Sequence, residues 1–266
     1  MDKAVYAVEA QVEETHWWFV GRRRLVSRLL EELGVSRDAR VVDIGSGTGT
    51  NLRMLREIGF REVTGLDASP VAIQFCHEKK LGPVEQGDVC KLPFEGERFE
   101  LALATDIIEH VDRDDLAVAE IHRVLRPGGA AIITVPAFAS LFGLQDEVSH
   151  HKRRYRMEGL RSVIEKAGLE VERSFHFNYL LFAPIWLARQ VIRVLRISLA
   201  SENQVNSPVL NWVLERLFRL DVRTAPTLRP PFGVSILAVA RRVAERPDRC
   251  AAERLGVAPG PATIGS

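Results

Sequence analysis

Three closely spaced glycines near the start of the chain have the arrangement of a ligand-binding turn, in the segment Val41-Val42-Asp43-Ile44-Gly45-Ser46-Gly47-Thr48-Gly49. The β-branched residues at its start predict a short buried strand, and the glycines predict a tight turn after it. Leucines and an isoleucine recur at helical spacing over 52–58, so the turn opens a helix. Backbone N–H groups and a helix N-terminus face one crevice in such a unit, which suits an adenosine-containing cofactor.

An acidic residue follows at the distance expected for a ribose contact. Asp67 ends the apolar segment 62–66, roughly 20 residues beyond the first glycine. A carboxylate at that strand end can accept hydrogen bonds from both ribose hydroxyls. Nicotinamide enzymes use the same contact, so Asp67 indicates an adenosine ribose without choosing the cofactor.

The glycine spacing argues against two common nucleotide sites. A dinucleotide turn follows the pattern G-x-G-x-x-G, whereas Thr50 stands here at the sixth position. A P-loop needs Gly-Lys before Ser or Thr, which this turn lacks. The sequence also lacks a Tyr-x-x-x-Lys pair, so a nicotinamide oxidoreductase is the weaker alternative. A non-catalytic protein that keeps the cofactor site is a second alternative, and it stays open.

Two histidines follow the ends of later expected strands. His110 comes shortly after the strand 99–104, and His151 lies in a polar loop after the strand 130–136. An imidazole titrates near neutral pH and can take a proton from a hydroxyl or amine. We favour His151 as the general base and a positioning or capping role for His110, with a solvated loop histidine as the alternative at 151. No second histidine stands at helical spacing from His110, so the sequence predicts no metal site.

Several segments together resemble one enzyme family. The turn from Val42 to Gly49 resembles the first motif of class I S-adenosylmethionine-dependent methyltransferases. Further similar segments are Gly87-Asp88-Val89, 106–111, 125–129, His16-Trp17-Trp18-Phe19 and 151–155. The last two are similar to a bacterial branch of the family that methylates small molecules and lipids. The resemblance covers roughly residues 13–175 and the final strand.

This resemblance implies S-adenosylmethionine as the cofactor and methyl transfer to an oxygen or nitrogen of a small-molecule or lipid-linked acceptor. The donor carries its own reactivity, so the protein chiefly aligns the reactants and excludes water. The implied cofactor-binding residues are Asp43, Gly45, Gly47, Gly49, Asp67, Ala68, Asp88, Val89, Thr105 and Arg22. Asp67 would hold the ribose and Asp88 the adenine amino group, with a plain turn aspartate as the alternative at 88. The segment around Arg22 would help to close the cofactor site, with a solvated helix start as the alternative.

The order of expected elements predicts one doubly wound, Rossmann-like α/β domain. We expect a seven-stranded, mostly parallel sheet with helices on both faces and an antiparallel last strand. We divide the chain into an N-terminal helical lid at 1–34, the methyltransferase domain at 35–242 and a disordered tail at 243–266. Within the domain, a helical insertion at about 178–232 precedes the last strand.

The insertion lies outside the family resemblance. Its segment 179–186 is almost wholly apolar but too short to span a bilayer. A second apolar helix is expected at 209–220, and prolines 226, 230 and 231 should break the chain after it. The residues expected to form a cationic stripe on one helix face are Arg189, Arg193 and Arg196. One interpretation is a helical cap over the domain, and the other is a surface in peripheral contact with a membrane.

Composition limits the remaining classes. Hydrophobic residues make up 46% of the 266, and the formal net charge of +1 gives no overall case for nucleic-acid binding. Three cysteines without metal-ligand spacing suit a reducing cytoplasm. The acidic N-terminus does not resemble a signal peptide. We therefore expect a cytoplasmic protein, at most peripheral to the membrane, and the sequence indicates no oligomeric state.

Overall fold

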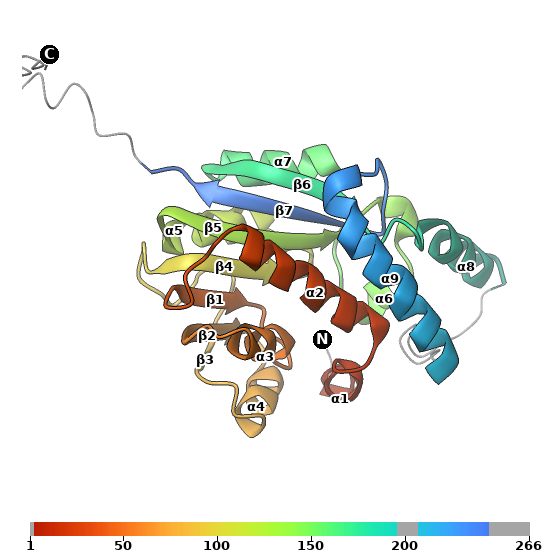
Figure 1. Ribbon diagram of the computed structural model, residues 1–266, viewed down its shortest axis with the longest axis horizontal. Helices are drawn as coiled ribbons and strands as arrows, with labels where there is room; N and C mark the ends of the chain where they lie inside the picture. The colour runs from red at the N-terminus through yellow and green to blue at the C-terminus, as the bar shows by residue number, and fades with distance from the viewer. Residues whose placement is uncertain (1–2, 196–206, 245–266) are drawn as a thin grey trace, which may run out of the picture.

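A seven-stranded sheet forms the centre of the structure, with the strand order β3-β2-β1-β4-β5-β7-β6. The computed structural model describes residues 3–195 and 207–244 (Figure 1). The strands are β1 (Arg40–Ile44), β2 (Glu62–Asp67), β3 (Val84–Gln86), β4 (Phe99–Thr105), β5 (Leu125–Pro136), β6 (Leu169–Phe177) and β7 (Ser235–Arg242). β1 to β5 pair in parallel, and β7 runs antiparallel to β5 and β6. The predicted fold class is confirmed.

Helices cover both faces of the sheet (Figure 1). The α-helices of the described residues are α1 (Lys3–Val12), α2 (Trp17–Glu32), α3 (Thr50–Glu57), α4 (Pro70–Glu78), α5 (Asp114–Val124), α6 (Leu144–Val148), α7 (Met157–Lys166), α8 (Phe182–Leu195) and α9 (Pro208–Leu228). One core cluster joins the sheet to α5 and α7, and a second joins it to α2, α3 and α9. The central strands are buried on both faces, which is why they are continuous apolar runs in the sequence.

The tandem tryptophans lie where α2 crosses α9. Trp17 meets the ring of Phe218 edge to face at 5.2 Å between centroids, and Trp18 stacks on the same ring at 5.3 Å. A Cβ at Gly21 would lie 2.1 Å from Phe218, so glycine is needed where the two helices touch. α2 begins at Trp17, one turn before the expected start at the arginines, because His16 caps the helix by accepting from the Trp18 N–H.

The insertion between β6 and β7 contains α8 and α9. α9 continues through Pro226 to Leu228, so the expected break at that proline is wrong. Pro226 removes one backbone donor but sits in the last turn, and the Arg229 N–H still reaches the Ala225 carbonyl at 2.9 Å. No helix in the described ranges is long and apolar enough to cross a membrane. The expected tail lies outside the described residues from 245 onward.

Candidate active site

The glycine turn joins β1 to α3 with the backbone in a conformation that glycine favours. Gly45, Gly47 and Gly49 have φ values of 74°, 52° and 92°. A Cβ at Gly49 would lie 2.3 Å from Leu81, so this glycine also permits close packing under the turn. A Cβ at Gly47 would meet nothing within 4 Å, because this part of the turn borders an open cavity.

Buried polar groups lie beneath this turn. Asp43 is fully buried, and its Oδ1 accepts a hydrogen bond of 3.0 Å from the Asn51 amide. The same amide donates to the Thr105 hydroxyl at 2.9 Å. Among the described residues, Asp43 Oδ2 and Asn51 Oδ1 are buried without a hydrogen-bond partner. Burial raises the pKa of Asp43 to about 7. Two acceptor oxygens beneath the turn thus have no hydrogen-bond partner among the described residues.

Asp67 connects the end of β2 to the glycine turn. Its Oδ2 accepts from the Gly47 N–H at 2.8 Å and its Oδ1 from the Ser69 N–H at 2.9 Å. Each carboxylate oxygen keeps a second lone pair, which leaves capacity for two ligand hydroxyls. Burial raises the pKa of Asp67, and the backbone donors oppose that shift. Ala68, the next residue, is exposed.

The predicted adenine contacts lie at the end of β3. Asp88 is exposed, and its Oδ1 accepts from the Cys90 N–H at 2.8 Å, as in a turn formed by an aspartate. Val89 is buried in the core. Asp88 thus has the contact of the turn alternative, and its role toward adenine stays a prediction.

The N-terminal segment is anchored directly on the glycine turn. The buried Glu13 carboxylate accepts a hydrogen bond from the Thr48 hydroxyl and pairs with Lys79 at 2.5 Å. Arg23 donates to the Thr50 hydroxyl at 2.7 Å and to the Glu13 carbonyl at 2.5 Å. Thr48 of the turn is therefore held by Glu13, which precedes α2, and Thr50 at the start of α3 is held by Arg23 within α2. The spacing of Glu13 in the sequence gives no sign of this contact.

Arg22 forms a buried ion pair beside the cofactor turn. It is 8% exposed, and its Nη1 lies 2.5 Å from Asp106 Oδ2 at the end of β4. The Thr134 hydroxyl donates to the other oxygen of Asp106 at 3.1 Å. Arg22 Nε has no hydrogen-bond partner among the described residues. The site thus presents one N–H donor together with the two acceptors beneath the turn.

A cavity of about 520 Å³ joins these groups to the loop after β5. Its lining includes Gly45, Gly47, Thr105, Arg22, His110 and His151 of the predicted site residues. Asp43, Gly49, Asp67, Ala68, Asp88 and Val89 are not part of that lining. Asp43 lies beneath the turn, and Gly49 is its last glycine. The remaining four residues lie at or just after the ends of β2 and β3. Burial, and then the charge of Asp67, raise the pKa of Tyr6 in α1 to about 12.

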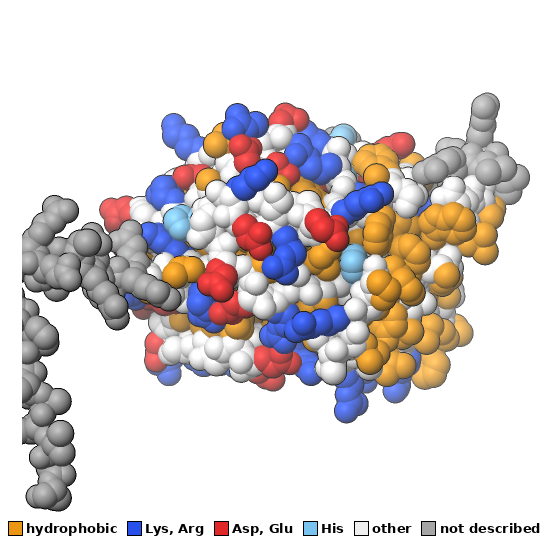
Figure 2. Space-filling model, turned by 90° about the horizontal axis from the view of Figure 1, so that it is seen from above, with side chains coloured by type: hydrophobic (Ala, Val, Ile, Leu, Met, Phe, Trp, Pro, Cys, Tyr) orange, Lys and Arg blue, Asp and Glu red, His pale blue; other side chains and the backbone are white. Residues whose placement is uncertain are grey.

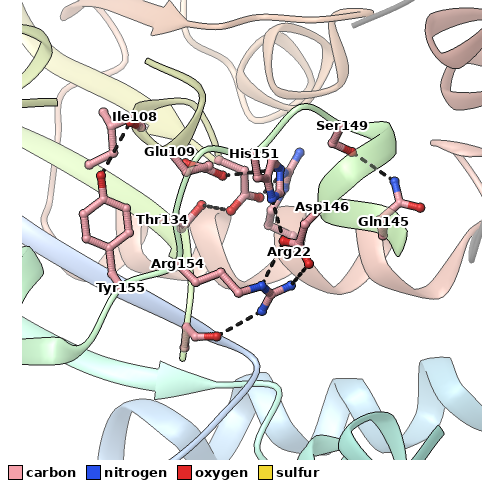
Figure 3. A network of polar contacts seen from close by, with 12 residues as sticks. Arg22, Ile108, Glu109, Thr134, Gln145, Asp146, Ser149, His151, Arg154 and Tyr155 are labelled. Atoms are coloured by element: carbon pink, nitrogen blue, oxygen red, sulfur yellow. Dashed lines mark hydrogen bonds and ion pairs between the residues drawn. The ribbon is translucent and has the colours of Figure 1, made fainter. Parts of the chain in front are cut away.

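The loop after β5 presents His151 to the cavity with a fixed orientation (Figure 3). Its Nδ1 lies 2.8 Å from Oδ1 of the fully buried Asp146. Arg154 donates to both oxygens of that carboxylate, at 2.8 and 3.0 Å. Burial opposes ionisation, yet the bonds from His151 and Arg154 hold the pKa of Asp146 at about 2. An ionised carboxylate only accepts, so Nδ1 carries a hydrogen, and in the neutral imidazole the lone pair is therefore on Nε2.

His110 and Glu109 lie next to this imidazole. The rings of His110 and His151 are 4.6 Å apart, and His151 Nε2 lies 3.9 Å from Glu109 Oε1. Burial lowers the pKa of His110 to about 4, and burial and then the Asp106 charge raise the pKa of Glu109. His110 is therefore neutral near pH 7, and burial favours the protonated form of Glu109. Each of these three residues has an atom that could bind a metal, and the three atoms lie within 4.8 Å of one another. A second histidine therefore does approach His110, but it comes from a distant segment, which a search at helical spacing misses. The expected absence of a metal stays a prediction.

Arg189 corrects the predicted cationic stripe. Its side chain is only 9% exposed, points inward, donates to the Leu141 carbonyl and lies 3.6 Å from Asp146 Oδ2. The buried Asp146 carboxylate attracts it, and helical spacing does not reveal that partner. The side chain of Arg193 and all of Arg196 lie outside the described residues.

Comparison with known proteins identifies the family. Residues 42–133 match the sequence model of a methyltransferase domain. A malonyl-[acyl-carrier protein] O-methyltransferase of Enterobacter lignolyticus is 30% identical over 179 residues, which cover 65% of this chain and 70% of that protein. The chain belongs to the S-adenosylmethionine-dependent methyltransferases, and its cofactor is S-adenosylmethionine. A second such O-methyltransferase, from Pseudescherichia vulneris, is 34% identical over 139 residues, and the chain spans about half of that relative, 54% of its length.

Solved structures share the fold. A complex of the Haloferax volcanii Trm112 methyltransferase activator with a methyltransferase matches with a TM-score of 0.62 and 21% identity, over 91% of this chain and 96% of that chain. Phosphoethanolamine N-methyltransferase 2 of Haemonchus contortus, in complex with S-adenosylmethionine, matches with a TM-score of 0.52 and 20% identity, over 83% of this chain and 52% of that one. At these identities the likeness concerns the fold alone.

The unpartnered polar atoms fit the methionine end of this cofactor. That end carries an ammonium group, which donates, and a carboxylate, which accepts. Asn51 and Arg22 line the cavity, and their unpartnered Oδ1 and Nε atoms are an acceptor and a donor of that kind. Because a buried polar atom without a partner costs roughly 1–3 kcal/mol, a ligand that satisfies both is favoured. The Asp43 carboxylate lies beneath the turn, outside the lining.

Proposed function

We propose that this protein transfers the methyl group of S-adenosylmethionine to an oxygen or nitrogen of a small-molecule or lipid-linked acceptor, with His151 as the general base. The observation that carries the proposal is the oriented His151–Asp146 pair, which borders the same cavity as the glycine turn. In a general base of this type, a carboxylate binds one imidazole nitrogen and orients the ring, and the other nitrogen is left to take the proton.

The residues around the turn would hold the cofactor in this proposal. Asn51 accepts from its ammonium group, the Asp43 carboxylate beneath the turn attracts that charge, and Arg22 donates to its carboxylate. Asp67 accepts from the ribose hydroxyls, and Asp88 takes the adenine amino group beside Ala68 and Val89. When bound, S-adenosylmethionine supplies a methyl group already activated by its sulfonium.

His151 would act on the acceptor in a single displacement. Its Nε2 takes the proton from the acceptor hydroxyl or amine as that atom bonds to the methyl carbon. The carbon–sulfur bond breaks at the same time, and its electron pair stays on sulfur to give S-adenosylhomocysteine. The proton remains on the imidazole, where the Asp146 carboxylate stabilises the resulting charge. His110, which is neutral at pH 7, packs edge to face against the His151 ring and helps to position it.

The acceptor class is supported by the relatives and by the cavity wall. Similar proteins are named as methyltransferases of malonyl-[acyl-carrier protein] and, in Staphylococcus aureus at 28% identity over 129 residues, of demethylmenaquinone. Ile185 and Leu214 from the insertion supply apolar surface to the cavity that His151 also lines. These features favour an acceptor with an apolar part, reached by a cytoplasmic protein that contacts the membrane peripherally through the insertion.

Incubation with methyl-labelled S-adenosylmethionine tests the proposal. The protein is mixed with a small-molecule extract and, separately, with a lipid extract of bacterial cells, and labelled products are identified by mass spectrometry. We expect a labelled product whose formation requires His151. Binding of S-adenosylhomocysteine without any labelled product in either extract would instead indicate a non-catalytic binding protein.

A further inference from the structure

Hydrophobic side chains gather on the outer faces of α8 and α9 (Figure 2, right). Trp186 and Leu187 of α8 are 41% and 58% exposed. Along α9, large apolar side chains that are 39–75% exposed are Val209, Leu210, Trp212, Val213, Leu217 and Leu220. Scattered apolar residues are normal on a surface, but a contiguous group of this kind marks an interaction site.

The outer face of α9 is divided into an apolar strip and a basic strip. Val209, Val213 and Leu220 recur at spacings of four and seven residues, so they share one side of the helix. Arg216 and Arg223 lie on the adjoining side, and both are exposed. The guanidinium of Arg216 lies 5.2 Å from the centre of the exposed Trp212 ring. An apolar strip bordered by arginines and a tryptophan is typical of a helix that lies in a membrane interface.

Further positive charge adjoins the basic strip. Arg24 and Arg28 of α2, with Arg219 and Arg223 of α9, line one shallow hollow. Arg24 and Arg219 share a single carboxylate, Glu215, each at 2.8 Å. Arg28 pairs with Glu32 at 2.8 Å, so the four arginines outnumber their two acidic partners. The surface therefore complements anionic lipid headgroups.

The same two helices separate this surface from the cavity. Ile185 and Ala188 of α8 line the cavity, while Trp186 and Leu187 between them are exposed. Leu214 of α9 also lines it, next to the exposed Val213. An acceptor held in a membrane under these helices would thus be separated from the cavity by one layer of side chains.

We propose that the outer faces of α8 and α9 form a docking surface for an anionic membrane, through which a lipid-linked acceptor reaches the cavity. The docking part stands on the surface alone, whereas delivery of the acceptor rests on the function proposed above. The charge is placed on α9 and α2, and the inward-facing Arg189 takes no part in it.

Vesicle sedimentation tests the docking surface directly. The full chain is mixed at low salt with phosphatidylcholine vesicles, with or without about one-third phosphatidylglycerol. We expect binding to the anionic vesicles that weakens with salt. Arg216→Gln with Arg223→Gln should lower partitioning to anionic vesicles about 30-fold, because each arginine near the surface contributes about 1 kcal/mol. Val209→Glu with Leu220→Glu should lower it by about tenfold or more, since charge replaces apolar contact.

Matched variants elsewhere on the surface control for charge alone. Arg61→Gln with Arg113→Gln removes two exposed arginines outside this surface, and Leu116→Glu adds an acid at a 41%-exposed leucine of α5. Both should leave partitioning unchanged. Binding of S-adenosylhomocysteine by every variant verifies folding and is scored separately, so loss of vesicle binding alone leaves the methyltransferase proposal intact.

Two results would overturn the docking proposal. One is failure of the unmodified protein to sediment with anionic vesicles at low salt. The other is a dimer in light scattering that Val209→Glu with Leu220→Glu converts to monomer, which would make this face an interface between two copies of the chain.

Discussion

Replacing His151 by asparagine should lower turnover by about 10²–10⁴-fold, the usual contribution of a general base. The asparagine amide can still donate to Asp146, which now accepts from His151 Nδ1 at 2.8 Å. The change therefore removes the basic nitrogen while the buried carboxylate keeps a donor. At about 1.36 kcal/mol per tenfold, the expected loss adds roughly 2.7–5.4 kcal/mol to the barrier. Affinity for S-adenosylhomocysteine should not change, because its proposed ligands lie at the glycine turn.

The neighbouring histidine provides the control. His150 is exposed and has a φ of 58°, a conformation that asparagine tolerates, so His150→Asn should keep full activity. Single-turnover rates are measured with labelled S-adenosylmethionine and the acceptor found in the extract assay. If His151→Asn keeps more than about a tenth of the wild-type rate, proton transfer to this imidazole does not limit the reaction and the base assignment is wrong.

Two further predictions concern the cofactor. Asp67→Ala should weaken S-adenosylhomocysteine binding by about 1.5–3 kcal/mol, the range for hydrogen bonds to a charged group, and calorimetry of a folded variant that shows no change would remove the ribose assignment. The ligand ammonium favours ionised Asp43, whose pKa is about 7, so affinity should fall up to about tenfold per pH unit below pH 7 and level off above it. Asp43→Asn should abolish that dependence, whereas Glu9→Gln, which removes another cavity-lining carboxyl with a pKa raised by burial to about 7, should keep it.

Local patterns were sufficient to predict the sheet and the cofactor turn. The central strands are buried on both faces, so their apolar runs mark them directly. The positive φ angles of the turn explain its glycines. The order of these units also indicates which strand ends meet. For that reason His110 and His151 could each be placed after the end of a strand before the distance between them was known.

Contacts between distant segments could not be read in the same way. Glu13, which holds Thr48 from 35 positions away, is an ordinary acidic residue in sequence, and only folding brings it to that partner. Asp146 stands five residues before His151, but no sequence motif marks that pair. Helical spacing placed Arg189 on a stripe but could not say that its side chain lies 3.6 Å from a buried carboxylate. The second helix was expected to end at residue 220, with Pro226 breaking the chain after it, because the sequence does not show that this proline falls within the last turn of α9.

Calorimetric titration with S-adenosylhomocysteine, and with NAD for comparison, tests the central claim most directly. The glycine turn, Asp43 and Asp67 should bind one S-adenosylhomocysteine per chain, and NAD should give no binding heat. Binding of NAD as tight as that of S-adenosylhomocysteine, or no binding of either by the folded protein, would contradict the assignment of this cavity to the methyl donor.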